Sequence, residues 1–173
     1  MTTRLASTGD SNAIAAIWNP IIRDTTVTFN SVEKSPSDVA DFMAEKKAAG
    51  AATFVAVDDS GEVLGFANYG QFRGGVGYRF SAEHSIVLAD RARGLGLGRQ
   101  LMQAVEGHAR ARGIHSIFAG VCTENEAGVA FHKALGFETR AVLPQVGHKF
   151  GRWLDLNLMQ KFLGAPDSAE KAG

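Results

Sequence analysis

Residues 86–102 read IVLADRARGLGLGRQLM, and this stretch decides the fold. Its first residues form a short apolar run that is typical of a buried strand, and the residues from Gly96 onward have the pattern of a helix. Three alternating glycines, Gly94, Gly96 and Gly98, join the two. Glycine lets a backbone come close to a ligand, and the first N–H groups of a helix are unpaired and attract anions. The stretch therefore predicts an anion cradle.

The spacing of the glycines distinguishes this cradle from two known kinds. The dinucleotide fingerprint requires another glycine three residues after its second one, and that position holds Arg99 or Leu101, depending on the register. A P-loop requires Gly-Lys-Ser/Thr, which the chain lacks. The alternative is a glycine-rich turn before an ordinary helix, although alternating glycines are costly unless the backbone has a role. A nucleotide-binding module is the least favoured interpretation.

The composition is that of an ordinary globular protein of 173 residues, with 18 basic and 18 acidic side chains. Zero net charge argues against a broad nucleic-acid surface. The single cysteine, Cys122, excludes an intrachain disulfide, and no Cys/His cluster has zinc spacing, so we expect no metal. The polar N-terminus and the lack of a long apolar run argue against a leader peptide and a membrane span. We therefore expect a cytoplasmic protein.

Periodicity and turn residues predict the order β-α-α-β-β-β-α-β-α-β-β. We expect one domain over residues 1–163 and a flexible tail over residues 164–173. The fold class is α+β, a mixed αβα sandwich whose sheet has about seven mostly antiparallel strands and is flanked by about four helices. The predicted strands are Thr3–Ala6, Thr53–Val57, Val63–Tyr69, Tyr78–Leu88, Ser116–Val121, Thr139–Leu143 and Trp153–Leu158, with a loop over 144–152.

Local signals set several boundaries. Pro20 lies inside the first helical pattern and is expected to bend or interrupt it. Ser35 and Pro36 are a cap and a first-turn proline for the second helix. The inner face of that helix is apolar except for Lys46, which falls in the same register. Between the two helices, Thr25–Asn30 is expected to be extended.

The pattern Arg93-x-x-Gly96-x-Gly98 resembles the pyrophosphate loop of the GNAT superfamily of N-acetyltransferases, and the register that starts at Arg91 also fits. Asn125 followed by Phe131–Phe137 resembles the last-helix motif of that superfamily. The resemblance implies a GNAT fold and acetyl-CoA as co-substrate. It also implies direct transfer of acetyl to an amine in a ternary complex.

A narrower resemblance, to the phosphinothricin and methionine sulfoximine N-acetyltransferases, covers segments between positions 26 and 155. These segments are Thr26–Phe29, Phe72–Arg73, Ala82–Ser85, Pro144–Gly147 and the Gly-x-Lys-x-Gly-x-Trp-x-Asp pattern of 147–155. This group acetylates the α-amine of small amino-acid analogues that carry a tetrahedral phosphinate, sulfone or sulfoximine. The resemblance implies such a substrate, a homodimer, and no nucleic-acid or membrane partner. Cys122 departs from the pattern, since the group has an acid there.

The resemblance assigns the coenzyme contacts to three segments. Backbone N–H groups and two arginines would hold the diphosphate, a strand N–H would polarise the thioester carbonyl, and an asparagine would touch the coenzyme arm. The matching residues are Arg93, Gly94, Leu95, Gly96, Leu97, Gly98 and Arg99 for the diphosphate, Ile86, Val87 and Leu88 for the thioester, and Asn125 for the arm.

Two residues are candidates for proton transfer. The attacking amine must be neutral, and Glu83 is the expected base, acting through a water. Strand alternation places Glu83 on the same face as Ser85 and Val87, close to the acetyl site; the alternative is a strand carboxylate in a salt bridge. His132 stands where many acetyltransferases have a Tyr that protonates the departing thiolate, and its ordinary pKa suits that role. The alternative is a packed or coenzyme-contacting histidine.

The anionic group of the substrate requires a cation. Arg73 is the first candidate because a guanidinium can pair bidentately, and Arg79 and Lys149 follow. Each of them could instead be a solvated surface charge. The remaining expected substrate contacts are Phe29, Val76, Gly77, Tyr78 and Glu83.

Other functions are compatible with the same superfamily. The acceptor could be a protein N-terminus or a polyamine, whereas the cations Arg73 and Lys149 favour a small anionic amine. A protein that binds acyl-CoA as a sensor without turnover is a second class. The presence of Glu83 argues against the sensor.

Overall fold

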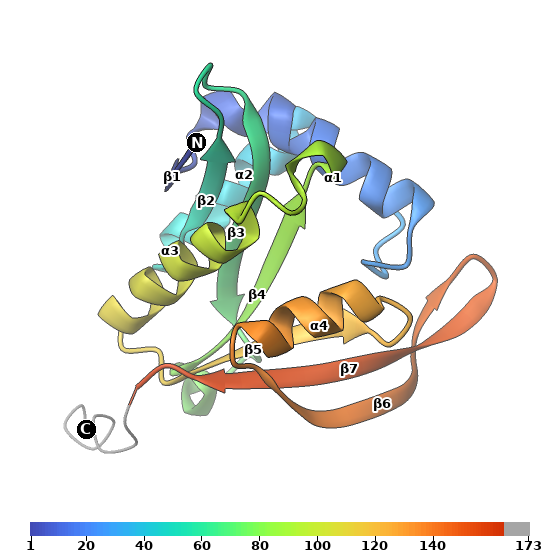
Figure 1. The fold of residues 1–173 in the computed structure, drawn as a ribbon. Helices are drawn as coiled ribbons and strands as arrows, with labels where there is room; N and C mark the ends of the chain where they lie inside the picture. The colour runs from blue at the N-terminus through green and yellow to red at the C-terminus, as the bar shows by residue number, and fades with distance from the viewer. Residues whose placement is uncertain (165–173) are drawn as a thin grey trace.

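The structure, a computed structural model, describes residues 1–164, and the elements follow the predicted order. Except for Gly164, the predicted tail lies outside the described residues. Within residues 1–164, no helix has the length and apolar character needed to cross a membrane. The strands are β1 Thr2–Leu5, β2 Thr53–Val57, β3 Val63–Gln71, β4 Ser81–Leu88, β5 Ser116–Cys122, β6 Glu138–Lys149 and β7 Arg152–Phe162, and the α-helices are α1 Ser11–Asp24, α2 Pro36–Ala48, α3 Leu97–Ala111 and α4 Glu126–Ala134 (Figure 1).

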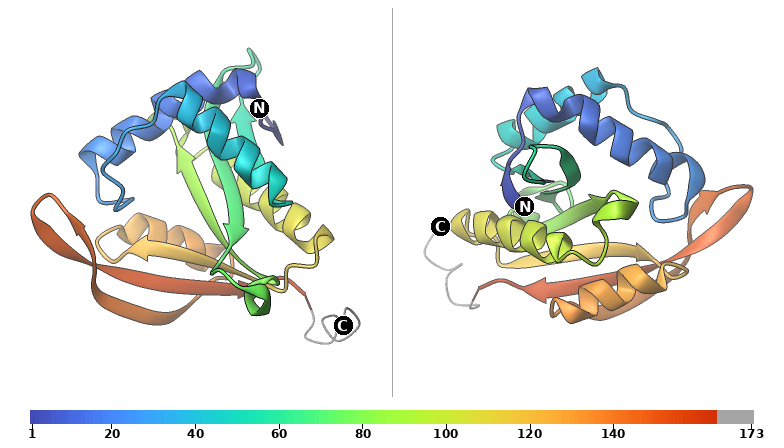
Figure 2. Two further views of the ribbon diagram at one scale, coloured as in Figure 1. Left: turned by 180° about the vertical axis from the view of Figure 1, so that it is seen from behind. Right: turned by 45° about the horizontal axis from the view of Figure 1, so that its top comes forward.

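The strands form one mixed sheet in the order β1-β2-β3-β4-β5-β7-β6, in which β4 and β5 are parallel. Helices α1 and α2 cover one face, and α3 and α4 cover the other (Figures 1 and 2). The larger apolar core includes Leu101 and Met102 of α3, and the smaller one includes Ile14 of α1 and Phe66 of β3. The predicted α+β class is confirmed.

The helix starts follow their local sequence closely. The Ser35 hydroxyl accepts a hydrogen bond from the Asp38 N–H at 3.1 Å, and the Asp38 carboxylate accepts one from the Ser35 N–H at 2.8 Å. This reciprocal cap confirms the predicted start of α2. Helix α1, in contrast, runs through Pro20 without the expected interruption. Proline removes one helical hydrogen bond, but the buried Ile14 and Ile22 hold both sides of it against the sheet.

The segment Thr25–Asn30 does not form part of the sheet. Its hydroxyl and amide side chains bond to nearby backbone instead. The Thr25 hydroxyl donates to the Ile21 carbonyl at 2.7 Å and accepts from the Val27 N–H at 3.2 Å, and Thr28 Oγ1 accepts from the Asn30 N–H at 3.2 Å. Such local bonds offer the backbone an alternative to a strand ladder.

Two predicted boundaries around the last strands were wrong. Strand β4 begins at Ser81 rather than Tyr78, because residues 76–78 form a 3-10 turn. The predicted loop over 144–152 is the outer part of a long β6–β7 hairpin that projects from the sheet (Figure 1). Phe150 and Gly151, at its tip, have positive φ values of 54° and 72°, which suit a two-residue turn between twisted strands.

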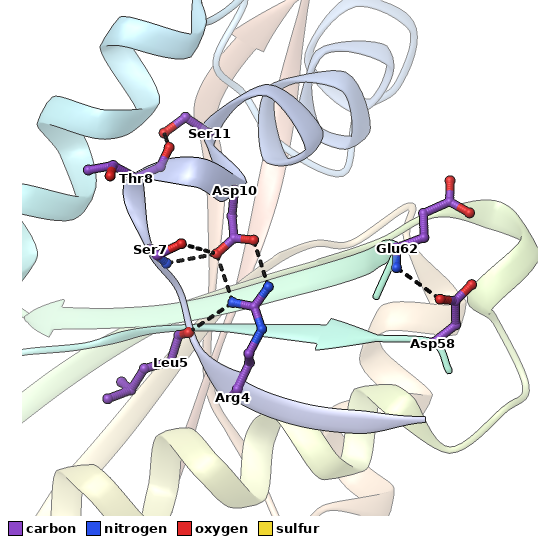
Figure 3. Close-up of polar contacts among 8 residues, drawn as sticks. All are labelled: Arg4, Leu5, Ser7, Thr8, Asp10, Ser11, Asp58 and Glu62. Carbon is purple, nitrogen blue, oxygen red and sulfur yellow. Dashed lines mark hydrogen bonds and ion pairs between the residues drawn. The ribbon is translucent and has the colours of Figure 1, made fainter. Parts of the chain in front are cut away.

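Asp10 ties β1 to the start of α1 (Figure 3). Its carboxylate accepts two hydrogen bonds of 2.8 Å from the Arg4 guanidinium, and two more from the Ser7 N–H and hydroxyl at 2.7 and 3.0 Å. The bonds from Arg4 and Ser7 lower the pKa of Asp10 to about 2, against the effect of its burial. Asp10 therefore closes the turn before α1, and its side chain does not cap the helix.

Candidate active site

A cleft opens where β4 and β5 separate. The two strands pair at only three positions, Ser81–Glu83 of β4 against Ser116–Phe118 of β5. Strand β4 stays paired with β3 as far as Leu88. Beyond Glu83, the β5 side of β4 has no strand partner among the described residues, and a cleft of about 670 Å³ lies there.

Most of the predicted site residues line this cleft, and the rest do not. Its wall includes Phe29, Glu83, Ile86, Val87, Leu88, Arg93, Gly94, Gly96, Gly98, Arg99, Asn125 and His132. Outside the wall lie Arg73, Val76, Gly77, Tyr78, Arg79, Leu95, Leu97 and Lys149. The structure thus brings the expected coenzyme and proton-transfer residues together, and leaves most of the expected substrate contacts at a distance from the cleft wall.

The glycine loop lies at one end of the cleft, at the start of α3. Gly94 and Gly96 each have a φ of +77°, which favours glycine, and Gly96 is the N-cap of the helix. No described atom lies within 4 Å of a Cβ built on either residue, so the loop has room for a ligand against its backbone. No side chain caps the first N–H groups of α3 in the described structure. The loop therefore fits a bound anion such as a diphosphate.

The side chains of this loop differ in where they lie. Arg93 lines the cleft and pairs with Asp90 at 3.1 Å, and both side chains are largely exposed. Arg99 also lines the cleft. Leu97 is fully buried in the core, while Leu95 is exposed away from the cleft wall. Only the backbone of these two leucines could contribute to the cradle.

Asn125 begins α4, which borders the cleft beside the glycine loop. Its Oδ1 accepts a hydrogen bond from the Gly128 N–H at 2.9 Å and so caps the helix. Further along α4, the Phe131 ring packs on α3, 3.0 Å from the position of a Cβ built on Gly98. The two motifs found in the sequence therefore meet at the cleft.

Glu83 lies at the vertex of the cleft, because it is the last residue of β4 that pairs with β5. Its Oε1 is 3.1 Å from the position of a Cβ built on Gly120 of β5, so the carboxylate lies over that glycine. Burial raises the pKa of the Glu83 carboxyl above its ordinary value, and the positive charge of Lys46 opposes the rise. A carboxylate in such a cleft suits a general base.

Lys46 is a charged neighbour of Glu83 that was absent from the predicted site. It belongs to the last turn of α2 and lies over Gly70, the β3 residue that pairs with Glu83. The available signal was its register, because a lysine on an otherwise apolar helix face is unusual. His84 was also missed, since it reads as one more residue of an alternating strand.

His84 and His132 meet on the opposite face of β4 from Glu83. The His132 Nδ1 lies 2.7 Å from the Gly128 carbonyl oxygen, which can only accept, so this nitrogen carries a proton. The two Nε2 atoms are 3.2 Å apart, so the neutral His84 donates to His132. Burial, with a smaller contribution from His132, lowers the pKa of His84 to about 3.

His132 has a lowered pKa as well, because burial outweighs the opposing effect of its bond to Gly128. Donation of a proton from its Nε2 requires a second proton on the ring, which burial disfavours. Among residues 1–164, no group of three or more His, Cys, Asp or Glu side chains could hold a metal ion.

The predicted substrate residues of the β3–β4 loop lie near the Glu83 end of the cleft. The Gln71 amide holds this loop, donating to the carbonyl oxygens of Arg73 at 2.5 Å and Gly75 at 2.8 Å. The Arg73 guanidinium lies 5.5 Å from the centre of the Phe72 ring, and that ring stacks on Phe118, the strand partner of Glu83, at 4.2 Å. One aromatic stack thus connects Arg73 to the base.

Lys149 has structural contacts rather than a free ammonium. It is buried, and its Nζ donates to the carbonyl oxygens of Thr25 at 2.6 Å and Thr28 at 2.8 Å. Next to it, Phe29 packs on Gly147 of β6. Lys149 therefore fixes the segment after α1, whose residues Val27, Thr28 and Phe29 line the cleft.

Known proteins share both the sequence and the fold. The model of the Acetyltransferase (GNAT) family matches residues 18–137. The L-methionine sulfoximine/L-methionine sulfone acetyltransferase of Pseudomonas aeruginosa is 43% identical over 169 residues, which cover 96% of each chain.

Two solved structures are similar as well. A phosphinothricin acetyltransferase from Sinorhizobium meliloti in complex with acetyl-CoA is 33% identical, with a TM-score of 0.89 over 94% of this chain and 88% of that one. A ribosomal-protein-alanine N-acetyltransferase from Brucella melitensis is 38% identical, with a TM-score of 0.90 over 94% and 99%. A family match over more than half the chain, together with relatives that cover nearly all of it, establishes that this chain belongs to the acetyltransferase (GNAT) family.

Proposed function

We propose that this protein is an acetyl-CoA-dependent N-acetyltransferase that acts on the α-amine of a small amino-acid analogue of the methionine sulfoximine, methionine sulfone or phosphinothricin type. The observation that carries the proposal is the separation of β4 and β5, which puts Glu83 and the glycine loop on one cleft. The identity with the Pseudomonas aeruginosa relative over 96% of both chains supports the substrate class.

The cleft would bind acetyl-CoA through backbone more than through side chains. The N–H groups from Gly94 to Arg99 would hold the diphosphate, with the dipole of α3 behind them and the Arg93 and Arg99 charges beside them. The unpaired edge of β4 at Ile86, Val87 and Leu88 would offer an N–H to the thioester carbonyl. Such oxyanion donors are typically worth about 3–4 kcal/mol of barrier. When bound, acetyl-CoA supplies an acetyl thioester, whose C–S bond is exchanged for a C–N bond to the amine.

Glu83 would accept, through a water, the proton that the amine loses as its nitrogen bonds to the acetyl carbon. We propose that both substrates are bound at this moment, because Glu83 and the β4 edge share one cleft. His132 would return a proton to the sulfur only when its ring is doubly protonated. In its neutral form the proton would come from water, and a thiolate leaves readily because its pKa is near 8.5.

The substrate anion would bind at the Glu83 end of the cleft, with Arg73 as its cation. Arg79, Val76, Gly77 and Tyr78 share that loop, and Phe29 provides an apolar wall. Lys149 would act indirectly, since its ammonium is already bound to Thr25 and Thr28. Its removal would release the segment that carries Phe29.

The assembly and location of the protein are also proposals. A homodimer is supported by the exposed apolar side chains of the projecting hairpin, where Val146, Phe150 and Trp153 are each more than half exposed. A reducing, cytoplasmic setting is supported by the free thiol of Cys122. Light scattering after size exclusion tests the first: a dimer is expected, and a monomer that persists at high protein concentration contradicts it.

The substrate proposal is tested by the release of CoA from acetyl-CoA with a panel of amines. The panel contains methionine sulfone, methionine sulfoximine, phosphinothricin, common amino acids, spermidine and a peptide that begins with alanine. The highest kcat/KM is expected for one of the first three. The peptide matters because of the similarity to the ribosomal-protein-alanine enzyme, and turnover confined to it or to spermidine would refute the proposal. Tight acetyl-CoA binding without turnover would favour a sensor.

A further inference from the structure

Lys46 lies on the inner side of α2, over the sheet beside Glu83. Its Nζ is 2.6 Å from the position of a Cβ built on Gly70, and 5.2 Å from the centre of the Phe42 ring. Gly70 pairs with Glu83 across β3 and β4. The ammonium and the carboxylate therefore come from adjacent positions on one face of the sheet, and a larger residue at position 70 would displace the lysine.

Within residues 1–164, neither charged group has a hydrogen-bond or ion-pair partner. Burial and charge alone perturb them: burial lowers the pKa of Lys46, while the charges of Glu83 and Glu45 oppose this, and Lys46 in turn acts on Glu83. Two opposite charges in a half-buried place stabilise each other's ionised forms. The space between them is open to a water or to the polar end of a substrate.

Few other ionisable groups face Glu83. The neighbouring residues of β3 and β5 on this face, Gly70, Phe118 and Gly120, cannot ionise. The other ionisable groups nearby lie further off: Glu45 beside Lys46, Arg73 beyond the Phe72–Phe118 stack, Cys122 further along β5 and His84 on the opposite face of the sheet. Lys46 is thus the charge best placed to act on Glu83.

We propose that Lys46 is a positioning residue for Glu83: its ammonium keeps the carboxylate ionised in the cleft, so that Glu83 is ready to accept the proton of the attacking amine. This role rests on the proposed function, in which Glu83 is the base. Burial by itself would keep Glu83 protonated to higher pH, and a protonated carboxyl cannot act as a base. Lys46 extends the activity to lower pH.

The test is the ratio of kcat/KM in the variant Lys46→Met to that of the wild type between pH 5.5 and 8.5, with methionine sulfone as the amine. Protonation of the amine affects both enzymes equally and cancels in the ratio. Because loss of a nearby opposite charge shifts a carboxyl titration by about one unit, we expect the ratio at pH 6 to be about tenfold lower than at pH 8.

Two control variants separate charge from packing. Lys46→Arg keeps the charge and is expected to give a ratio that does not depend on pH. Lys47→Met neutralises the adjacent lysine, which is exposed on the same helix, and is expected to do the same. A ratio for Lys46→Met that is constant over the pH range, or one for Lys46→Arg that falls equally at low pH, would overturn the proposal.

A second measurement does not depend on turnover. The carboxyl carbon of Glu83 can be titrated by ¹³C NMR in the free wild-type protein and in Lys46→Met. A higher midpoint in the variant is expected, and an unchanged midpoint overturns the role of Lys46. If the wild type acetylates no amine but the midpoint still shifts, the proposed function fails while the coupling between Lys46 and Glu83 stands.

Discussion

Glu83 and His84 are consecutive residues of β4, yet the two faces of the sheet give them opposite environments. Glu83 faces the side of α2, where the cleft is open and Lys46 and Arg73 supply positive charge nearby. His84 faces α4, where it is buried against His132 and held neutral. One face thus carries a group that can exchange protons near neutral pH, and the other carries a locked pair of imidazoles.

This difference teaches that position in the strand, rather than residue type, decides which group can do chemistry. Histidine ordinarily titrates near neutral pH and carboxylates titrate well below it. Here burial reverses the order, lowering the pKa of the histidine and raising that of the carboxyl. The assignment of Glu83 as base can therefore be broken by comparing the two faces.

The largest effect is expected for Glu83→Gln. Removal of a general base typically costs about 10²–10⁴-fold in rate, so kcat should fall by that factor while acetyl-CoA affinity stays unchanged. The measurements are CoA release and acetyl-CoA titration calorimetry. His84→Gln is the matched control, since its amide can still donate to His132. An equal loss of kcat in both variants would show that the two faces are not functionally distinct.

A smaller effect is expected for Arg73→Ala, on the Glu83 side. Loss of a hydrogen bond between charged groups costs about 1.5–3 kcal/mol, so the KM of the amine should rise about 10- to 100-fold. The KM of acetyl-CoA should not change. Both constants come from the same steady-state assay. Arg79→Ala serves as the comparison, and a larger rise there would move the substrate cation to Arg79.

Gly96→Ala should separate coenzyme binding from both faces of β4. Its φ of +77° makes alanine strained by about 1–2 kcal/mol, and the new methyl group lies on the cradle. We expect a KM for acetyl-CoA about tenfold higher, equivalent to one lost hydrogen bond to a charged group. Gly113→Ala has the same φ away from the cleft. It should lose similar thermal stability with an unchanged KM, and a raised KM would attribute the effect to strain alone.

The smallest effect concerns stability on the His84 side. Because the folded-state pKa of His84 is about 3, below its ordinary value, the unfolded chain binds its proton first as the pH falls below about 6.5. The free energy of unfolding should therefore decrease from pH 6.5 toward pH 4, by up to about 1.4 kcal/mol per pH unit from this residue. Urea unfolding measures it, and His84→Gln should flatten the slope. An equally steep slope in the variant would contradict the assignment.

Some of the site could be predicted because its signals are local. The glycines at 94, 96 and 98, the cap at Ser35 and the order of strands and helices all depend on residues close together in the chain, and the structure confirms their geometry. The placement of Lys149 could not be predicted in this way. Its partners, the carbonyl oxygens of Thr25 and Thr28, are more than 120 residues away, and no local pattern marks them.

The sequence by itself determined the cradle, the alternation that puts Glu83 on one face of β4, and the family to which the chain is similar. Only the tertiary structure decided where β4 leaves β5, that Lys46 comes to lie over Gly70, and that His84 is neutral beside His132. The physical reason is range. Backbone geometry and periodicity are set by neighbours in the chain, whereas burial and charge depend on which distant segments the fold packs around a residue.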